Sequence, residues 1–325
     1  MTGHQVSITA AFSDAWERMV TILFRPFRLE KWLALGFTAW LAGLAGGGKG
    51  FHWNVGNWSG SSDSDVFSSG SGSARGGDWS ELASWGRWLL EHPFWVAAAV
   101  FGCLVLIAII VVVLWLSSRG KFMFLDNVVH DRAEVVRPWK RFRRLGDSLF
   151  GFQIAFIASM MLVMLLAALV GLAIVELGNE ALGGLAAWIG LVFGISIALP
   201  LILAVGFAQY FLDAFVVPLM HRYDLGVLAA WGRFGAIFRQ HPWVLLISGL
   251  FVLSVGFAAV MAALIAGVLT CCIGLILIII PYVGTVVLLP IPVTYRGFTV
   301  ALLDQIDPGY FSESGSVAPA QPTNS

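Results

Sequence analysis

The sequence predicts an all-α, polytopic helical membrane protein. We expect about six transmembrane helices, arranged as three repeated hairpins that each follow an interfacial amphipathic helix. Three observations support this fold class: an apolar composition, six long apolar runs, and a pair of motifs that recurs three times. Of the 325 residues, 58% are hydrophobic and 12% are charged, and the mean hydropathy is +0.85. Such a chain has too little polar surface to stay soluble as a globule, so a bilayer must be its solvent.

The apolar runs are close to the ~20 residues that a helix needs to cross the hydrocarbon core of a bilayer. The first run is short and dissolves into the glycines at 46–48, and the last two are separated only by a turn near Thr270. The six predicted spans are 31–48, 93–117, 149–175, 185–211, 243–269 and 274–295.

The distribution of lysine and arginine predicts the orientation of these spans. Of the 19 basic residues, all but Lys49, Arg75 and Arg87 fall on one side. Positive charge is retained on the cytoplasmic side during insertion, so both termini and the loops 118–148 and 220–242 should be cytoplasmic, in an inner (cytoplasmic) membrane. An alternative places 49–92 in the cytoplasm, but it would carry the basic 118–148 loop outward.

The composition also divides the chain. Residues 1–30 form a cytoplasmic N-terminus with an amphipathic helix, and residues 31–308 form a single transmembrane domain. A Gly/Ser-rich stretch at 49–78 has no apolar period and is predicted to be a flexible outer loop. The tail at 309–325 is polar and proline-containing and is predicted to be disordered in the cytoplasm.

Two short motifs alternate along the chain and indicate an internal repeat. The opening motif is Trp-x-Arg followed by Met or Phe, and it begins at Trp16, Trp139 and Trp231. The closing motif is two large apolar residues and an aspartate, and it ends at Asp126, Asp213 and Asp304. We therefore expect three homologous units at about 10–130, 131–220 and 221–308.

The opening motifs are typical of helices that lie in the headgroup layer. Around the first motif, apolar and polar residues occupy opposite faces of a helix. Tryptophan suits this depth because it combines an apolar ring with one N–H donor, and arginine binds lipid phosphate. The candidate lipid-interface residues are Trp16, Arg18, Trp139, Arg141, Trp231 and Arg233. Anionic membrane lipids are the expected partners.

The last predicted span contains Tyr295-Arg296-Gly297-Phe298 and ends with Leu303-Asp304-Gln305. Together with the Trp-x-Arg helices and the Pro-aromatic entries to the spans, this pattern resembles uncharacterised bacterial multi-pass membrane proteins. It is also distantly similar to the membrane domain that some bacteria fuse to a glycerophosphodiester phosphodiesterase. The phosphodiesterase catalytic domain has no counterpart in this chain. The resemblance therefore implies a fold type and no activity.

The sequence offers no motif for catalysis, and we expect no enzyme, no cofactor and no metal site. The six histidines are scattered, and the basic run at 140–144 is what topology and anionic lipid already require, so nucleic-acid binding is not expected. The leading hypothesis is a non-enzymatic scaffold, accessory or lipid-organising protein, with a protein partner or a second copy as further candidates. The rival is a permease for an uncharged or amphipathic solute, suggested by the repeat and the proline-broken spans.

The three closing aspartates form the candidate site. If the hairpins pack around a pseudo-three-fold axis, Asp126, Asp213 and Asp304 should approach one another at a cytoplasmic mouth. Arg119 and Arg296 lie about two helical turns before Asp126 and Asp304, where they would offset the repulsion between the carboxylates. The alternative is that each aspartate lies separately in the headgroup layer.

Overall fold

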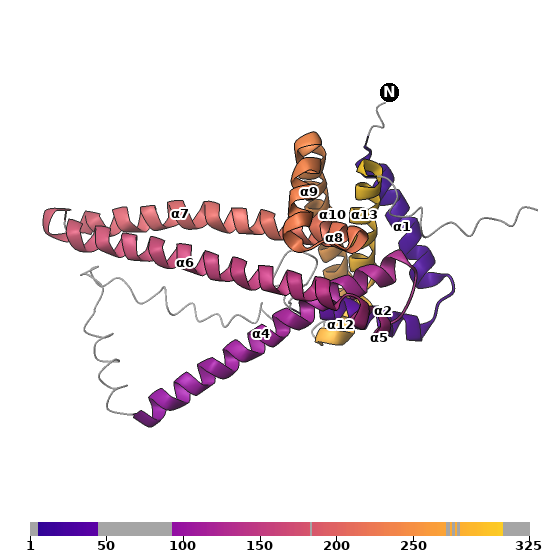
Figure 1. The fold of residues 1–325 in the computed structure, drawn as a ribbon, viewed down its shortest axis with the longest axis horizontal. Helices are drawn as coiled ribbons and strands as arrows, with labels where there is room; N and C mark the ends of the chain where they lie inside the picture. The colour runs from indigo at the N-terminus through magenta and orange to yellow at the C-terminus, as the bar shows by residue number, and fades with distance from the viewer. Residues whose placement is uncertain are drawn as a thin grey trace, which may run out of the picture. The chain divides into compact units, whose positions relative to one another are not determined.

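The computed structural model describes residues 6–44, 93–182, 184–270, 274, 277 and 280–307, and within these ranges every regular element is a helix (Figure 1). The predicted outer loop at 49–78 and the predicted tail at 309–325 lie outside them. In chain order the elements are α1 (Ile8–Phe24), α2 (Leu29–Gly43), α4 (Pro93–Val129), α5 (Val136–Arg141), α6 (Arg143–Leu182), α7 (Gly184–Phe211), the π-helix η3 (Leu212–Val216), α8 (Val217–Tyr223), α9 (Val227–Gln240), α10 (Pro242–Leu269), α12 (Pro281–Val287) and α13 (Pro290–Ile306).

The chain divides into two compact units. The first comprises Met1–Val55, Leu114–Phe152 and Ala208–Ser325, and the second comprises Gly56–Val113 and Gln153–Phe207. The described buried apolar core belongs to the first unit. In the second unit, Gly190 of α7 approaches the main chain of α6, because a β-carbon there would lie 3.2 Å from the Gly171 carbonyl oxygen.

Four helical stretches of the described chain are long and apolar enough to cross a membrane. They are Val96–Val129, Arg143–Gly178, Trp188–Tyr223 and Pro242–Leu269, and their mean hydropathy is 2.5 or higher. These are the second to fifth of the six predicted spans. The first predicted span corresponds to α2, which has only 15 residues. The sixth is divided into α12 and α13, both of which start at a proline.

Helix α1 packs along α13 in the first unit. Its N-cap, Ser7, accepts a hydrogen bond from the Ala10 N–H at 3.3 Å. The Ser7 N–H donates to Gln305 Oε1 at 2.9 Å, and Ala15 lies against Gly297. These contacts run in opposite directions along the two helices, so α1 and α13 are antiparallel.

This packing changes the interpretation of α1 as a helix whose apolar face contacts lipid. Met19 and Leu23, predicted to lie on that face, are buried inside the protein. Trp16 is 52% exposed, and Phe24 and Phe27 are also exposed. The apolar face is therefore shared between the surroundings and the protein core, where Met19 and Leu23 belong to one buried cluster with Leu35 and Val293.

Helix α2 is held between α12 and α4. Tyr282 of α12 donates its hydroxyl to the Leu33 carbonyl at 3.0 Å, and Ser117 of α4 donates to the Ala42 carbonyl at 2.7 Å. Gly120 is required on α4, because a β-carbon there would lie 2.6 Å from the main-chain nitrogen of Ala42. The first predicted span thus packs on protein at both ends.

An aromatic core joins the π-helix η3 to α9. The rings of Phe215 and Phe234 stack with their centroids 5.7 Å apart, and Phe211 lies 5.2 Å from Phe234. Phe215 is fully buried. A π-helix inserts an extra residue into a turn, and here the inserted turn contains Asp213.

Candidate functional site

A buried ionic group lies in the first compact unit, where helices α4, η3 and α13 meet. Asp213 is on η3, and its carboxylate accepts a hydrogen bond from Lys121 Nζ of α4 at 2.6 Å. Arg296 of α13 donates to the main-chain oxygen of Asp213. Lys121 and Arg296 are each only 5% exposed. Buried charges are costly unless paired, so this contact fixes α4, η3 and α13 together.

Asp126 lies in a second group, with two histidines. It is 5% exposed, and its Oδ1 lies 3.1 Å from His130 Nδ1 and 3.3 Å from His221 Nε2. His130 follows directly after Val129, the last residue of α4, whereas His221 comes from α8. The His221 ring also packs 4.9 Å from the ring of Phe142. The sequence analysis found the six histidines scattered and did not place two of them beside Asp126.

The first two closing segments are thus joined by reciprocal pairs. Lys121 of α4 binds Asp213 of η3, and Asp126 of α4 lies beside His221 of α8. The signal that could have found this is spacing: His221 follows Asp213 by eight residues, or about two turns.

Asp304 lies elsewhere in the first unit. It lines a polar cavity of about 320 Å³ between α1 and α13, together with Asp14, Arg18 and Gln305. Burial lowers the pKa of Arg18, and the nearby carboxylates of Asp131 and Asp304 oppose that shift. The structure therefore associates Asp304 with α1. The convergence of all three aspartates at one mouth stays a prediction.

Arg119, which was expected to offset the charge of the aspartates, pairs with a different acid. Its Nη2 lies 2.8 Å from Asp147 Oδ1 of α6. The guanidinium also stacks over two tryptophans, 4.2 Å from the ring of Trp115 and 5.2 Å from that of Trp139. Arg296 does contact a closing aspartate, but it is Asp213 of the second predicted repeat and not Asp304 of its own, third repeat.

The three arginines of the opening motifs have different surroundings. Arg18 is partly buried and donates to the Val129 carbonyl at 2.9 Å. Arg233 donates to Asp307 Oδ2 at 3.1 Å and lies 3.8 Å over the ring of Tyr223. Arg141 is exposed and lies 5.3 Å from the ring of Phe142. Arg233 is also exposed, but it donates to a carboxylate, whereas the contact described for Arg141 is an aromatic ring.

The tryptophans of the three opening motifs also differ in their exposure. Trp16 is exposed, whereas Trp139 and Trp231 are half-buried. Trp139 packs edge-on against Trp115 of α4 at 5.8 Å, and Trp231 packs against Phe152 of α6 at 6.4 Å. Two of the three therefore anchor their helices to the protein.

Sequence reasoning missed a cluster around Asp307 at the end of α13. Its carboxylate accepts hydrogen bonds from the Tyr223 hydroxyl at 2.8 Å and from Arg233, and its main-chain oxygen accepts one from Arg222. Burial alone would raise the pKa of Asp307, but these hydrogen bonds and the positive charges of the arginines lower it overall. The hydrogen bond to Asp307 likewise raises the pKa of Arg233.

A basic segment connects two candidate spans. We use the name basic segment for residues 132–144, which follow the span ending at Val129 and overlap the start of the next. Its six cations are all exposed: Arg132, Arg137, Lys140, Arg141, Arg143 and Arg144. Glu134 is its single carboxylate, so the segment carries a net positive charge at the end of two apolar helices.

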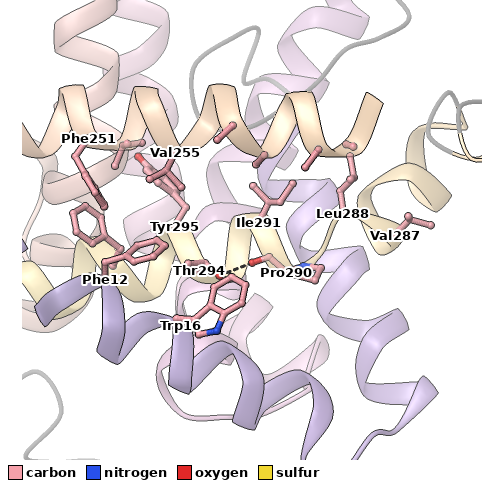
Figure 2. Close-up of a pocket in the computed structure, with 16 residues that line it drawn as sticks. Phe12, Trp16, Phe251, Val255, Val287, Leu288, Pro290, Ile291, Thr294 and Tyr295 are labelled. Carbon is pink, nitrogen blue, oxygen red and sulfur yellow. Dashed lines mark hydrogen bonds between the residues drawn. The ribbon is translucent and has the colours of Figure 1, made fainter. Parts of the chain in front are cut away.

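An apolar groove lies between α1, α10 and α13 in the first unit, with a volume of about 520 Å³ (Figure 2). Its lining is almost entirely hydrocarbon. The Thr294 hydroxyl in the lining donates to the Pro290 carbonyl at 2.8 Å, so its donor is used within α13. The groove borders the break between α12 and α13, where Leu288 and Pro290 line it.

The sequence model of a family of unknown function, DUF7544, matches residues 6–306. Comparisons with the curated proteins and with the solved structures give no match. An uncharacterised family agrees with the resemblance noted from the sequence, but nothing links the chain to the membrane domain associated with glycerophosphodiester phosphodiesterases.

Proposed function

Since the chain belongs to the DUF7544 family, whose function is unknown, we propose that it is a non-enzymatic membrane protein that gathers anionic lipid at the cytoplasmic face of the bacterial inner membrane. Its apolar helices would supply the anchor, and the basic segment would supply the attraction for headgroups. A scaffold or accessory role toward a protein partner or a second copy is compatible with this arrangement.

The observation that carries the proposal is the exposure of the basic segment at the membrane boundary. Each Lys or Arg near an anionic surface contributes about 1 kcal/mol of attraction. Two of the six cations, Arg143 and Arg144, have side chains that are 76% exposed, although each has a carboxylate within 4.0 Å. Ion pairs as exposed as these contribute little, which leaves the cations available to lipid phosphate.

The proposed topology has six spans in three repeats with both termini in the cytoplasm. Helix packing supports the repeat, because each opening segment contacts the closing segment of another predicted repeat. Helix α1 packs on α13, Phe142 after the second opening motif stacks on Phe122 of α4 at 6.2 Å, and α9 packs on η3 and α8. This is the cyclic pattern that three repeated units would make.

The experiment is lipid analysis of the purified protein. The chain is extracted in mild detergent and its retained lipids are quantified by mass spectrometry against the composition of the source membrane. We expect enrichment of anionic lipid in the wild type. Four cations together contribute ~4 kcal/mol of attraction for anionic headgroups. If a third of this free energy acts on the bound lipid, replacing Arg137, Lys140, Arg141 and Arg143 by Gln should lower the enrichment about tenfold.

The matched control keeps the charge and changes the side chain. In it, the three arginines become Lys, and Lys140 becomes Arg. Lipid attraction by charge alone predicts that this control retains the wild-type enrichment. A wild-type protein whose retained lipids match the bulk membrane would overturn the proposal.

A second candidate function is a permease for an uncharged or amphipathic solute. It is favoured by the apolar groove beside the break between α12 and α13, since broken helices form substrate sites in many transporters. A solute that raises the thermal unfolding midpoint and is taken up by vesicles containing the protein would favour this function over lipid organisation.

A further inference from the structure

We propose that the groove between α1, α10 and α13 binds one acyl chain of a membrane lipid as a specific site. This goes beyond the proposed function, because a chain can enter the groove whether or not anionic headgroups gather at the basic segment. The two are also separate in the sequence, since no groove-lining residue belongs to 132–144.

The walls of the groove come from three helices. Figure 2 shows Phe251 and Val255 directed from α10 toward α13, and the rings of Phe12 and Trp16 directed toward α13 from α1. Along α10 the lining continues through small side chains, among them Ala259 and Ala263. The aromatic rings therefore border one part of the groove. In the other part, the short alanine side chains leave the volume that an occupant could fill.

The length of the groove matches one bilayer leaflet. The lining of α10 extends from Phe251 to Ala263, which is about 18 Å at 1.5 Å per residue. Half of the hydrocarbon core of a bilayer is about 15 Å. An extended acyl chain that reaches from the interface toward the midplane would thus contact the groove along its whole length.

The width of the groove selects the occupant. A volume of about 520 Å³ over about 18 Å gives a cross-section of about 29 Å², or a width near 6 Å. A helix from a second copy is about 10–12 Å across and would not enter. Aliphatic carbons touch at about 4 Å, so a single unbranched hydrocarbon chain fits.

The surroundings of α10 argue against water as the occupant. Three of its large apolar residues outside the groove, Leu250, Leu253 and Phe257, are each at least 66% exposed. A helix with such a surface, and with a length sufficient to cross a membrane, lies in hydrocarbon. A groove open on that helix and lined by hydrocarbon is filled by the surrounding lipid, since water needs polar partners to enter.

Photo-labelling tests the site in the unmodified full-length chain. The protein is reconstituted in vesicles of a diacyl phospholipid, a small fraction of which carries a diazirine on one acyl chain. It is then extracted into detergent, which removes lipid that only surrounds the protein, and illuminated, and labelled residues are mapped by mass spectrometry. We expect labelling of Val255, Ala259 and Ile291 at least about fivefold above that of Leu253 and Phe257. Equal labelling of both sets would overturn the proposal, as would a cross-linked dimer joined through the groove.

Substitutions that fill the groove provide the second arm. Ala259→Phe, or Ala262→Phe one turn away, should reduce labelling of Ile291 by about fivefold. Ala266→Phe makes the same change at an exposed residue of α10 outside the lining and should leave labelling unchanged. The site would be contradicted if Ala266→Phe abolished the labelling of Ile291. It would also be contradicted if a groove variant that still folds left this labelling unchanged. Because these changes spare the basic segment, anionic lipid enrichment should persist, which separates a failure here from a failure of the proposed function.

Discussion

At the residue scale, the Lys121–Asp213 ion pair is the contact with the largest expected effect on stability. Its atoms lie 2.6 Å apart, and the side chains of Lys121 and Asp213 are 6% and 23% exposed. Removing one partner of a buried pair leaves an uncompensated charge and costs about 3–5 kcal/mol, whereas replacing both by apolar residues is often neutral. Lys121→Met should therefore strongly lower the free energy of unfolding in mixed micelles, and Lys121→Met with Asp213→Leu should lower it less. If the double variant loses as much stability as Lys121→Met and Asp213→Leu lose in sum, the pairing is refuted.

The Asp307 cluster gives a second residue-scale prediction, this time in pH. The pKa of Asp307 is lower in the folded protein than its ordinary value of 3.8. The charged carboxylate therefore stabilises the fold above pH ~4, and this contribution is lost as the pH falls through the folded pKa. At pH 7, Asp307→Asn should cost about 1 kcal/mol or less, because Arg233 is partly exposed. The thermal midpoints of wild type and variant should converge below pH ~4. Asp224→Asn, at a carboxylate that is 75% exposed, should show no such convergence.

At the element scale, the close approach of α2 to α4 depends on Gly120. A methyl group there would lie 2.6 Å from a main-chain atom of Ala42, which cannot move aside as a flexible side chain would. Gly120→Ala should thus destabilise the protein by about 1–3 kcal/mol through overpacking. Gly102→Ala is the matched control on the same helix, since nothing lies within 4 Å of a β-carbon there. It should be neutral or slightly stabilising, because alanine is the better helix former. Thermal unfolding of both variants decides between them, and equal midpoints would remove the proposed contact.

At the scale of the whole molecule, the orientation of the chain is the testable property. In a background without Cys103, Cys271 and Cys272, a cysteine at Ser68 should react with an impermeant thiol reagent in intact cells, and a cysteine at Arg132 should not. The physical reason is the retention of positive charge in the cytoplasm, where the basic segment is expected. Permeabilised cells, in which both positions should react, provide the control. The opposite pattern would invert the membrane topology and place the proposed lipid surface on the outer face.

The sequence by itself determined the properties that depend on composition and on local periodicity. Helical content and the four candidate spans follow from long apolar runs, and the opening motifs do fall on or beside helices α1, α5 and α9, because hydrophobic periodicity is a local signal. Only the tertiary structure decided which partners the charged residues take. Asp126 lies beside His221 across 95 residues, and Lys121 binds Asp213 across 92. It also decided that Met19 and Leu23 are buried against protein, and that the last predicted span is divided at Pro290. These outcomes depend on how helices far apart in the sequence pack, and a pattern read along one helix carries no information about the neighbour that will cover it.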